Sequence, residues 1–318
     1  MATIVTGGAG FIGSTLVDRL LGEGREVVAV DNFDPYYDAA RKRANLAGAL
    51  RSPRFRLVEL DIRDADGVAR LVADVRPEAI AHLAARAGVR PSIADPAGYA
   101  ETNVVATIHW LEAARKLSVL PRFVYASSSS VYGDRVDGPF RETDPVARPV
   151  SPYAATKQAC ELLAATYNHL YGLPVAGLRL FTAFGPRNRP DLAIAKFAAL
   201  IARGEPVPMF GDGTTRRDYT FVGDIAAGIN AALDRATGLH IYNLGHAEPV
   251  ALRDLIAAIG VALGRTPIVD QLPPQPGDVG QTHADIARAR AELGYHPATG
   301  LAEGLDRYVA WLRVGDRG

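Results

Sequence analysis

The sequence contains little that would indicate disulfide, metal or nucleic-acid chemistry. Its 318 residues include one cysteine, Cys160, so no internal disulfide can form, and no Cys/His spacing is typical of a metal site. Cys160 falls among alanine and leucine, so we expect it in the core. Thirty-five basic residues balance 35 acidic ones, and this neutrality gives no reason to expect nucleic acid or an anionic membrane as a partner. No apolar run spans a membrane and no signal-peptide pattern precedes the first strand, which predicts a cytoplasmic protein.

Lysine is scarce as well, because only four of the 35 basic residues are lysines. One of them, Lys157, follows Tyr153 by four residues in the segment Ser-Pro-Tyr-Ala-Ala-Thr-Lys, which is predicted to be helical. Residues four apart share one helix face, and a nearby ammonium favours phenolate over phenol. The pair therefore predicts a tyrosine that acts as a base, although surface helices also carry such pairs by chance.

The first half of the chain alternates short apolar strands with helices. Strands rich in Val, Ile and Leu that are separated by helices predict a parallel sheet covered on both faces. We therefore expect an α/β protein with a doubly wound, Rossmann-type sheet. The expected strands are 2–6, 26–30, 55–60, 79–83, 122–126 and 174–180. One expected helix starts at residue 11, another ends near residue 75, and two longer ones cover 97–117 and 152–171.

After residue 180 the chain becomes rich in loops that contain Gly, Pro and Arg, at 185–190, 204–208, 211–217 and 272–280. Ligand contacts concentrate in loops on a scaffold. We therefore divide the chain into a Rossmann domain at 1–180 and a smaller mixed α/β substrate-binding lobe at 181–318. Segment 219–243 is predicted to return to the main sheet as strand, helix and strand. The helices expected in the lobe are 192–203, 252–263, 286–293 and 301–312.

A glycine-rich turn with the spacing Gly-x-x-Gly-x-x-Gly follows the first strand at the mouth of a helix. Backbone without side chains can approach a pyrophosphate there, and the helix amino terminus favours its charge. An aspartate ends the second strand, where it can accept hydrogen bonds from the adenosine ribose and would repel a 2'-phosphate. The predicted cofactor is therefore NAD rather than NADP. The residues assigned to this part of the site are Gly7, Gly10, Phe11, Ile12, Gly13, Asp31 and Asn32.

Two further strand ends carry candidate cofactor contacts. Asp61 follows the third strand, where it can either cap the helix that begins near Asp64 or contact the adenine amine. His82, at the end of the fourth strand, is expected to be a hydrogen-bonded structural histidine. The residues after it are expected where a cofactor would cross the sheet edge, and they are Leu83, Ala84 and Ala85.

The chain resembles the extended short-chain dehydrogenases/reductases that act on nucleotide sugars. The resemblance covers essentially the whole chain, and it implies a Rossmann fold, bound NAD and hydride chemistry at a sugar carbinol. The matching segments are Thr-Gly-Gly-Ala-Gly-Phe-Ile-Gly at 6–13, His-Leu-Ala-Ala at 82–85, Ser-Ser-Ser-Ser-Val-Tyr-Gly at 127–133, Tyr153 with Lys157, Arg-Arg-Asp-Tyr at 216–219 and Pro-Gly-Asp-Val at 276–279.

Within that family the chain is most similar to the UDP-glucuronate 4-epimerases, through the segments 31–38, 87–93, 185–191 and 275–279. This resemblance implies a homodimer joined through the helices at 97–117 and 152–171. Two positions depart from the family pattern, because Arg86 replaces a glutamine and Asn188 replaces a glycine. The resemblance assigns Asp61 and Ile62 to adenine, Asn103 and Phe181 to the cofactor, and Arg217 and Asp278 to UDP.

The serine stretch at 127–130 separates the reactions of this family. Related 4,6-dehydratases carry an Asp-Glu pair at the positions of Ser129 and Ser130, and decarboxylating relatives carry a glutamate at the second position. This chain has only hydroxyls there. We therefore expect that a 4-keto sugar swings about its pyrophosphate link and receives its hydride back on the other face.

The predicted catalytic set is Tyr153 as the base, Lys157 as its cationic partner, and Ser128 as the hydroxyl that holds the same sugar oxygen. Ser127 and Ser129 can share the hydroxyl role. Ser127 is also assigned to the cofactor site and Ser129 to the substrate site. Each serine fits a turn at a strand end equally well.

A uronic acid substrate adds a requirement, because a ketone at carbon 4 makes its carboxylate a β-keto acid that can lose carbon dioxide. A fork that holds the carboxylate near the ring plane opposes this loss, and arginine provides such a planar, bidentate grip. We predict Arg189 for this grip, with Thr182 as a hydroxyl donor and Arg187 in reserve. Arg189 can instead pair with Asp191 or cap the next helix.

At the nucleotide end, Arg217 is predicted on the pyrophosphate and Arg216 in solvent. Phe210, within 208–211, is predicted to pack on uracil, although the interior of an apolar strand would have the same sequence.

The predicted function is therefore NAD-dependent 4-epimerisation of a UDP-sugar, from UDP-glucuronate to UDP-galacturonate. The alternative is a UDP-glucose or UDP-N-acetylhexosamine 4-epimerase, in which Arg189 would be structural. The serines at 129 and 130 oppose a uronate decarboxylase or a 4,6-dehydratase. A nucleotide-sensing Rossmann protein without turnover is expected to lack the Tyr-Lys pair, which this chain keeps.

Overall fold

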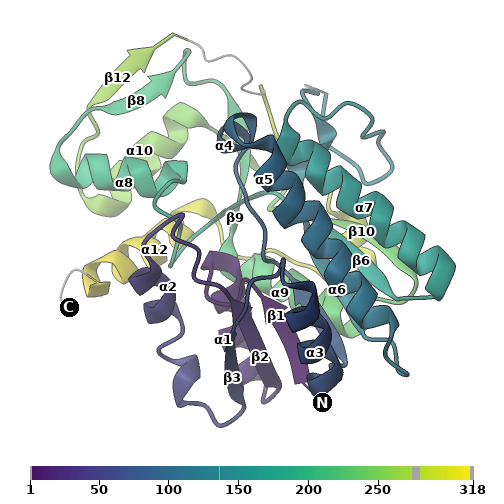
Figure 1. The fold of residues 1–318 in the computed structure, drawn as a ribbon. Coiled ribbons are helices and arrows are strands. Elements are labelled where there is room, and N and C mark those ends of the chain that lie inside the picture. Colours follow the sequence, from purple (N-terminus) through teal and green to yellow (C-terminus); the bar gives the residue numbers. More distant parts are fainter. Residues whose placement is uncertain (1, 136, 274–279, 316–318) are drawn as a thin grey trace.

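A seven-stranded parallel sheet runs through the centre of the molecule (Figure 1). The computed structural model describes residues 2–135, 137–273 and 280–315. The strand order is β10-β6-β5-β4-β1-β2-β3, and every neighbouring pair is parallel. This order reverses beside β1, which confirms the predicted doubly wound α/β fold. The strands are β1 (Ala2–Thr6), β2 (Glu26–Asp31), β3 (Phe55–Glu59), β4 (Ala79–His82), β5 (Arg122–Ser128), β6 (Val175–Leu180) and β10 (Leu239–Leu244).

Helices cover both faces of this sheet. On one face α1 packs against α9, which also contacts β4, β5 and β6, and on the other face α3 packs against α6 and α6 against α7. Consecutive strand residues are therefore buried in different clusters, with Ile4 and Phe123 on one side and Val5 and Val124 on the other. These helices are α1 (Phe11–Gly22), α3 (Ala65–Val75), α6 (Ala106–Arg115), α7 (Pro152–Tyr171) and α9 (Val222–Arg235).

A π-helical turn interrupts the long helix predicted at 97–117. The structure has α5 (Pro96–Ala100), the π-helical η2 (Glu101–Val105) and then α6. Such turns recur near functional sites, because they shift the side chains on one helix face. Here η2 carries Asn103, whose amide donates to the carbonyl of Arg86 and to Oγ1 of Thr156, each at 3.0 Å. The turn thus joins the loop after β4 to α7.

The second half of the chain adds a smaller lobe, and its elements β8, β12, α8 and α10 are drawn at the upper left of Figure 1. In the lobe β12 pairs with β8, and β9 lies between β11 and β7. The predicted return of 219–243 to the main sheet therefore holds for β10 but not for β9, because β7 and β11 occupy both edges of β9. The division of the chain at residue 180 stays a prediction. The remaining elements of the second half are β7 (Thr182–Phe184), α8 (Ala193–Arg203), β8 (Val207–Phe210), β9 (Arg216–Phe221), β11 (Pro249–Ala251), α10 (Leu252–Leu263), β12 (Val269–Leu272), α11 (Ala287–Leu293) and α12 (Leu301–Gly315). The helix α11 was predicted in the lobe but packs on α9 and β10 of the main sheet.

Four short helical segments lie in stretches where the sequence predicted no element. Segments of this length give no readable periodicity, which explains why they were not predicted. They are α2 (Ala39–Asn45), η1 (Ala49–Arg51), α4 (Val89–Ala94) and η3 (Ser129–Tyr132).

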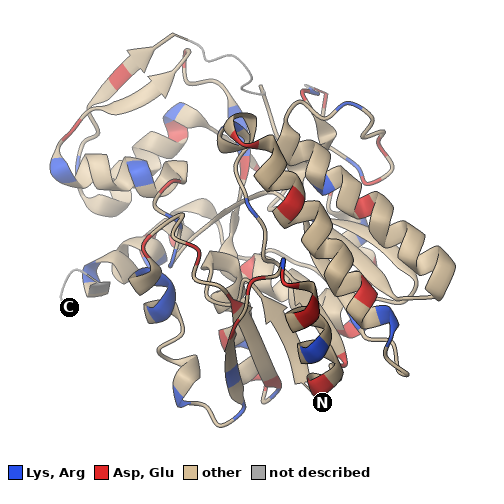
Figure 2. Cartoon of the chain, viewed as in Figure 1, with Lys and Arg blue, Asp and Glu red and all other residues tan. Residues whose placement is uncertain are grey.

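Acidic and basic residues alternate along the ribbon in Figure 2, in line with the neutral composition. Among the described residues, every helix is too short or too polar to cross a membrane. The same residues contain no group of three or more His, Cys, Asp or Glu side chains that could hold a metal ion.

Candidate active site

Tyr153 and Lys157 lie in the first turns of α7, and Ser151 caps this helix by accepting a hydrogen bond from the amide of Ala154 at 3.1 Å. Nζ of Lys157 lies 6.0 Å from the centre of the Tyr153 ring. It also donates to the carbonyl of Ala126 in β5 at 2.7 Å, and the Lys157 residue is only 5% exposed. The ammonium is thus anchored between sheet and helix, where it supplies a fixed positive charge beside the phenol.

Ser128 is the last residue of β5, and α7 packs against both β5 and the turn η3 that follows. Its Oγ accepts a hydrogen bond from the amide of Ser130 at 3.1 Å and donates to the hydroxyl of Ser130 at 3.2 Å. The turn therefore orients the Ser128 hydroxyl at the sheet edge where α7 begins. At 129 and 130 this turn carries serines, so it presents no carboxyl group at these positions.

Ser127 forms a buried hydrogen bond within the protein. Its hydroxyl donates to Oε1 of Glu161 at 2.6 Å, and the residue is 2% exposed. Glu161 in turn receives two hydrogen bonds from Arg179, of 3.0 Å from Nε and 2.8 Å from Nη2. In this structure the Ser127 hydroxyl is therefore bound to Glu161, and its predicted roles at the cofactor and beside Ser128 stay predictions.

The Glu161–Arg179 pair was missed by the sequence analysis, although a signal was present. Glu161 lies one turn beyond Lys157 on a largely apolar helix, and Arg179 interrupts an apolar strand. Burial alone would lower the pKa of Arg179, but the hydrogen bonds and charge of Glu161 outweigh it and raise that pKa. The ion pair therefore stays charged between α7 and β6.

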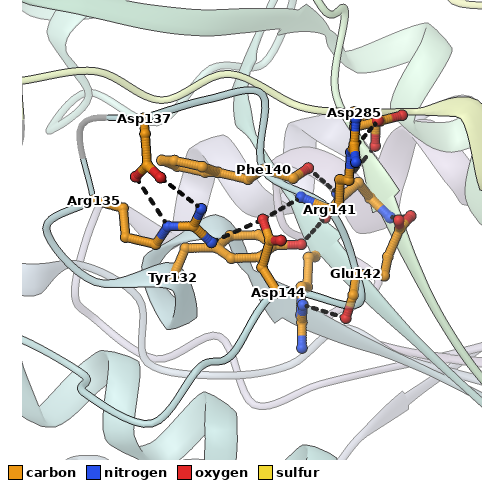
Figure 3. Close-up of polar contacts among 10 residues, drawn as sticks. Tyr132, Arg135, Asp137, Phe140, Arg141, Glu142, Asp144 and Asp285 are labelled. Carbon is orange, nitrogen blue, oxygen red and sulfur yellow. Dashed lines mark hydrogen bonds and ion pairs between the residues drawn. The ribbon is translucent and has the colours of Figure 1, made fainter.

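The segment after the serines ties the site to the smaller lobe (Figure 3). The amide of Phe140 donates to the carbonyl of His283 at 2.7 Å, and the carbonyl of Phe140 accepts from the amide of Asp285 at 2.9 Å. Arg141 donates to Oδ2 of Asp285 at 3.2 Å. The described chain resumes at residue 280, so these contacts hold the segment that directly follows 274–279.

The glycine-rich turn after β1 has the geometry that a dinucleotide cradle needs. Gly7 has φ of 67°, and a Cβ at Gly13 would lie 2.0 Å from the carbonyl oxygen of Gly7. Gly10 caps α1 without a side-chain hydrogen bond, so the first amides of the helix are available to an anion. Phe11 and Ile12 form the first turn. These residues fit the pyrophosphate of a dinucleotide.

Asp31 faces the same turn from the end of β2. Its Oδ2 accepts from the amide of Ala9 at 3.1 Å and its Oδ1 from the amide of Phe33 at 2.9 Å. A carboxylate has about four acceptor positions, so ribose hydroxyls can still be bound. Nζ of Lys42 lies 3.9 Å from Oδ1 of Asp31, which is an ion-pair distance, and its hydrogen bond goes to the carbonyl of Asp34 instead. Lys42 is 7% exposed.

Asp61 does not cap the following helix, because Asp64 does so by accepting from the amide of Gly67 at 3.0 Å. Asp61 instead accepts two hydrogen bonds from the guanidinium of Arg63, at 3.0 and 2.7 Å, one from the backbone amide of Arg63 at 2.9 Å, and one from Nδ2 of Asn32 at 3.0 Å. The hydrogen bonds from Arg63 lower the pKa of Asp61 to about 2. Ile62 is 6% exposed. The contact of Asp61 and Ile62 with adenine stays a prediction.

His82 is confirmed as a structural histidine. Its Nδ1 lies 3.0 Å from Oγ1 of Thr6 and its Nε2 lies 3.2 Å from Oγ1 of Thr107. Burial, together with the charge of Lys157, lowers the pKa of His82 to about 3. The amides that follow are also fixed, because those of Leu83 and Ala84 donate to Oγ1 of Thr6.

Three other residues lie in the packed interior near α7. Cys160 is buried, donates to the carbonyl of Asn103 at 3.1 Å, and has a raised pKa because of its burial, as expected for a core residue. Asn103 and Phe181 are 1% and 3% exposed. Contacts of Asn103, Phe181 and Ala85 with a cofactor stay predictions.

Arg189 forms the ion pair that the sequence left open. Its Nε lies 3.0 Å from Oδ1 of Asp191 and its Nη2 lies 2.7 Å from Oδ2. Burial would lower the pKa of Arg189, but the hydrogen bonds and charge of Asp191 outweigh it and raise that pKa, so the guanidinium stays charged. Arg187 is held elsewhere, 2.7 Å from Asp18 of α1.

The nucleotide end of the predicted site is only partly described. Nη1 of Arg217 donates to the carbonyl of Arg216 at 2.9 Å. Phe210 ends β8, and the guanidinium of Arg90 lies 5.9 Å from the centre of its ring. Thr182 opens β7, the strand beside β9. Asp278 lies outside the described residues.

The two departures from the family pattern differ in their surroundings. Arg86 pairs with Asp95 and stacks on the Tyr99 ring at 4.9 Å. Asn188 is 3% exposed, and within the described part of the chain neither atom of its side-chain amide has a hydrogen-bond partner.

Comparisons with known proteins agree with this geometry. The family model described as GDP-mannose 4,6 dehydratase matches residues 4–308. UDP-glucuronate 4-epimerase 4 of Arabidopsis thaliana is 40% identical over 330 residues, which cover 98% of this chain and 75% of the relative. A crystal structure of UDP-glucuronic acid 4-epimerase from Bacillus cereus, in complex with UDP-glucuronic acid and NAD, has a TM-score of 0.92 and 34% identity, with 99% of each chain covered. UDP-glucose 4-epimerase from Thermotoga maritima, solved with UDP-glucose, has a TM-score of 0.90 and 32% identity, again with 99% of each chain covered. The chain therefore belongs to the epimerase and dehydratase branch of the extended short-chain dehydrogenase/reductase family.

Proposed function

We propose that this chain is an NAD-dependent UDP-glucuronate 4-epimerase, which interconverts UDP-glucuronate and UDP-galacturonate. The observation that carries the proposal is the junction of β5, η3 and α7. There α7, which carries Tyr153 and Lys157, packs on the end of β5 that carries Ser128, and the turn between them has serines at 129 and 130. Similarity to UDP-glucuronate 4-epimerases over 98% of the chain supports the same activity.

In this mechanism Tyr153 takes the proton from the 4-hydroxyl of the sugar, and Ser128 donates a hydrogen bond to the same oxygen. The positive charge of Lys157 stabilises the phenolate. The carbonyl of Ala126 holds the ammonium of Lys157 in place for this role. The chemistry that NAD supplies when bound is a hydride acceptor and donor at carbon 4. The residues that would hold it are those of the glycine-rich turn, with Asp31 at the adenosine ribose. When hydride returns to the opposite face of the 4-keto sugar, Tyr153 gives its proton back to the oxygen.

Arg189 is the residue proposed to hold the carboxylate of the uronic acid, with Thr182 as a second donor. If the guanidinium holds the carboxylate near the ring plane, the bond between carbons 5 and 6 is not aligned with the π system of the ketone. This arrangement opposes loss of carbon dioxide. Arg217, Phe210 and Asp278 are proposed to bind UDP.

A 4-epimerase for UDP-glucose or a UDP-N-acetylhexosamine is the second candidate. It is favoured by one observation, the bidentate pairing of Arg189 with Asp191, which fits a structural arginine as well. Incubation of the purified protein with UDP-glucuronate, without added NAD, separates the two candidates when the sugar products are followed by NMR. Formation of UDP-galacturonate supports the first candidate. Turnover of UDP-glucose alone would support the second, and a UDP-pentose as the main product would mean a decarboxylase.

We also propose a homodimer joined through η2, α6 and α7 and a cytoplasmic location. The pairing is supported by apolar side chains that these helices expose, since Val105 is 44%, Leu162 65% and Leu170 60% exposed. Light scattering should give twice the chain mass for the wild type and a lighter particle for Leu162→Glu. A monomeric wild type would contradict the dimer, and fractionation of cells tests the location.

A further inference from the structure

Among the described residues, the hydrogen bonds of Arg189 use one edge of its guanidinium. Asp191 occupies the edge formed by Nε and Nη2, at 3.0 and 2.7 Å. The two side chains are 18% and 31% exposed, so this pair is more shielded than a surface ion pair. A guanidinium has five N–H donors in a fixed plane, and the edge formed by Nη1 and Nη2 still has donors to offer. Asp191 therefore sets the direction in which the second edge points.

Tyr36 holds the same pair from another part of the chain. Its hydroxyl donates to Oδ2 of Asp191 at 3.3 Å, and the centre of its ring lies 5.5 Å from the Arg189 guanidinium carbon. The hydroxyl bond fixes Asp191, and the ring limits the tilt of the guanidinium plane. Tyr36 lies in the loop after β2, four residues beyond Asn32 of the cofactor site. A contact thus joins the loop of the cofactor site to the loop that carries Arg189.

The charges in this group decide what the free edge can bind. Arg189 and Asp191 together are neutral, so the pair attracts an anion through directed hydrogen bonds more than through net charge. For such a site, a small error in the orientation of the guanidinium costs binding and alignment. Although burial would raise the pKa of Asp191, the hydrogen bonds and charge of Arg189 leave it below its ordinary value, so Asp191 stays ionised.

We propose that Asp191 and Tyr36 are positioning residues, which aim the free edge of Arg189 at the carboxylate of a uronic acid substrate. This inference rests on the proposed function and extends it. It makes the choice between a uronic acid and a neutral sugar depend on residues that do not touch the sugar.

The chemistry gives this positioning a second readout. When the carboxylate of the 4-keto sugar turns out of the ring plane, the electron pair of the bond between carbons 5 and 6 can pass into the ketone. Carbon dioxide then leaves, an enolate forms, and a proton from water adds at carbon 5. A loosely held Arg189 therefore gives a UDP-linked 4-ketopentose or, if the hydride first removed from carbon 4 is returned there, a UDP-pentose.

Asp191→Asn tests the role of Asp191 with little change in shape. The amide keeps one acceptor but presents an NH2 group to a guanidinium N–H, so one of the two hydrogen bonds is lost. Calorimetry on the holoenzyme should show affinity for UDP-glucuronate reduced about tenfold, while affinity for UDP alone is unchanged. NMR of the turnover mixture should show a larger share of pentose products. Tyr36→Ala should act in the same direction, by about three- to fivefold.

Glu205→Gln is the matched control. Arg203 and Glu205 have the same spacing and the same two-bond geometry, at 2.7 and 2.9 Å, but they are exposed and distant in sequence from the 189–191 loop. This variant should leave both affinities and the product ratio unchanged. Asp191→Glu should recover part of the affinity, because a carboxylate again meets the guanidinium.

Four results would overturn the inference. Tighter binding of UDP-glucuronate by Asp191→Asn would mean that Asp191 competes with the substrate for Arg189. Equal losses for UDP and UDP-glucuronate would mean a general structural role. Unchanged variants of an active wild type would remove the positioning role and leave the proposed function intact, whereas a wild type that turns over only UDP-glucose would overturn both.

Discussion

Two bidentate arginine–carboxylate pairs lie near the candidate site, and they differ in how firmly the fold holds them. Arg179 and Glu161 join β6 to α7, with side chains 4% and 9% exposed. Arg189 and Asp191 are two residues apart in the loop before α8, with side chains 18% and 31% exposed. The first pair lies between regular elements of the Rossmann sheet, and the second lies in the loop predicted to bind substrate.

The partners of each pair show what the difference means. Glu161 also accepts from Ser127 at 2.6 Å, and the guanidinium of Arg179 lies 4.7 Å from the centre of the Tyr132 ring. The hydrogen-bonding groups of the Glu161–Arg179 pair therefore hold β5, the strand that ends in Ser128. The Arg189 pair keeps an edge for a ligand. We infer that the Glu161–Arg179 pair supports the chemistry common to every substrate, and that the Arg189–Asp191 pair selects among substrates.

The largest effect is expected for Tyr153→Phe, which removes the base and keeps the ring. Turnover should fall by roughly 10³-fold or more, because general base catalysis typically contributes 10²–10⁴-fold and hydride loss here requires a deprotonated oxygen. The loss should be the same for every UDP-sugar that the wild type turns over, while NAD, measured after denaturation of the purified protein, is retained. A variant that remains active would remove Tyr153 from the catalytic role.

Glu161→Ala should produce the largest loss of stability. It leaves Arg179 buried without its counter-charge, which costs about 3–5 kcal/mol of unfolding free energy in comparable buried pairs. Urea unfolding measures this loss, and turnover of UDP-glucuronate and UDP-glucose should fall together because Ser127 loses its acceptor. Glu59→Ala is the control, since Glu59 pairs with Arg43 in the same two-bond manner on an exposed surface. If Glu161→Ala and Glu59→Ala unfold alike, the comparison between buried and exposed pairs is wrong.

The two pairs also show how far the sequence could predict this molecule. Regular elements followed from local patterns, because the periodicity of α7 and α10 and the apolar run of β1 gave their bounds residue by residue. The π-helical turn η2 was not predicted, since one extra residue in a helical turn leaves the apolar pattern almost intact. The place of β9 was missed because strand pairing depends on contacts that are distant in sequence.

The site could be predicted in part for a related reason. Tyr153, Lys157 and Ser128 belong to short motifs, so their meeting followed from the order of strands in a doubly wound sheet. The partner of Ser127 is 34 residues away, and no local pattern indicates which carboxylate it meets. Asp191 was anticipated as an alternative partner of Arg189, whereas Tyr36 was not connected with it, because the two loops meet only in the folded chain.

The free energy of unfolding should fall in acid because of the sheet, since the buried His82 lies in β4. Its folded-state pKa of about 3 lies below the ordinary value of 6.5, so the unfolded chain binds the proton first as pH falls. The contribution of His82 is complete above about pH 6.5 and is lost toward pH 3, at up to about 1.4 kcal/mol per pH unit. Urea unfolding at pH 7 and pH 5 measures it.

His82→Asn should reduce this dependence on pH, and His169→Gln, which removes an exposed histidine of α7, should not. Equal pH dependence in the wild type and in His82→Asn would mean that other groups carry the acid sensitivity.

Arg189→Lys should have the smallest effect on stability and the sharpest effect on selectivity. Lysine keeps the charge but loses the planar fork, so it cannot bind Asp191 and a uronate carboxylate in the same two-bond manner. Affinity for UDP-glucuronate should fall about five- to tenfold relative to UDP, while the unfolding free energy changes by less than about 1 kcal/mol. Arg203→Lys, in the exposed pair with Glu205, should change neither quantity. A loss of stability as large as that of Glu161→Ala, or equal losses for UDP and UDP-glucuronate, would place Arg189 with the buried pair, because a residue that holds the fold affects all ligands alike.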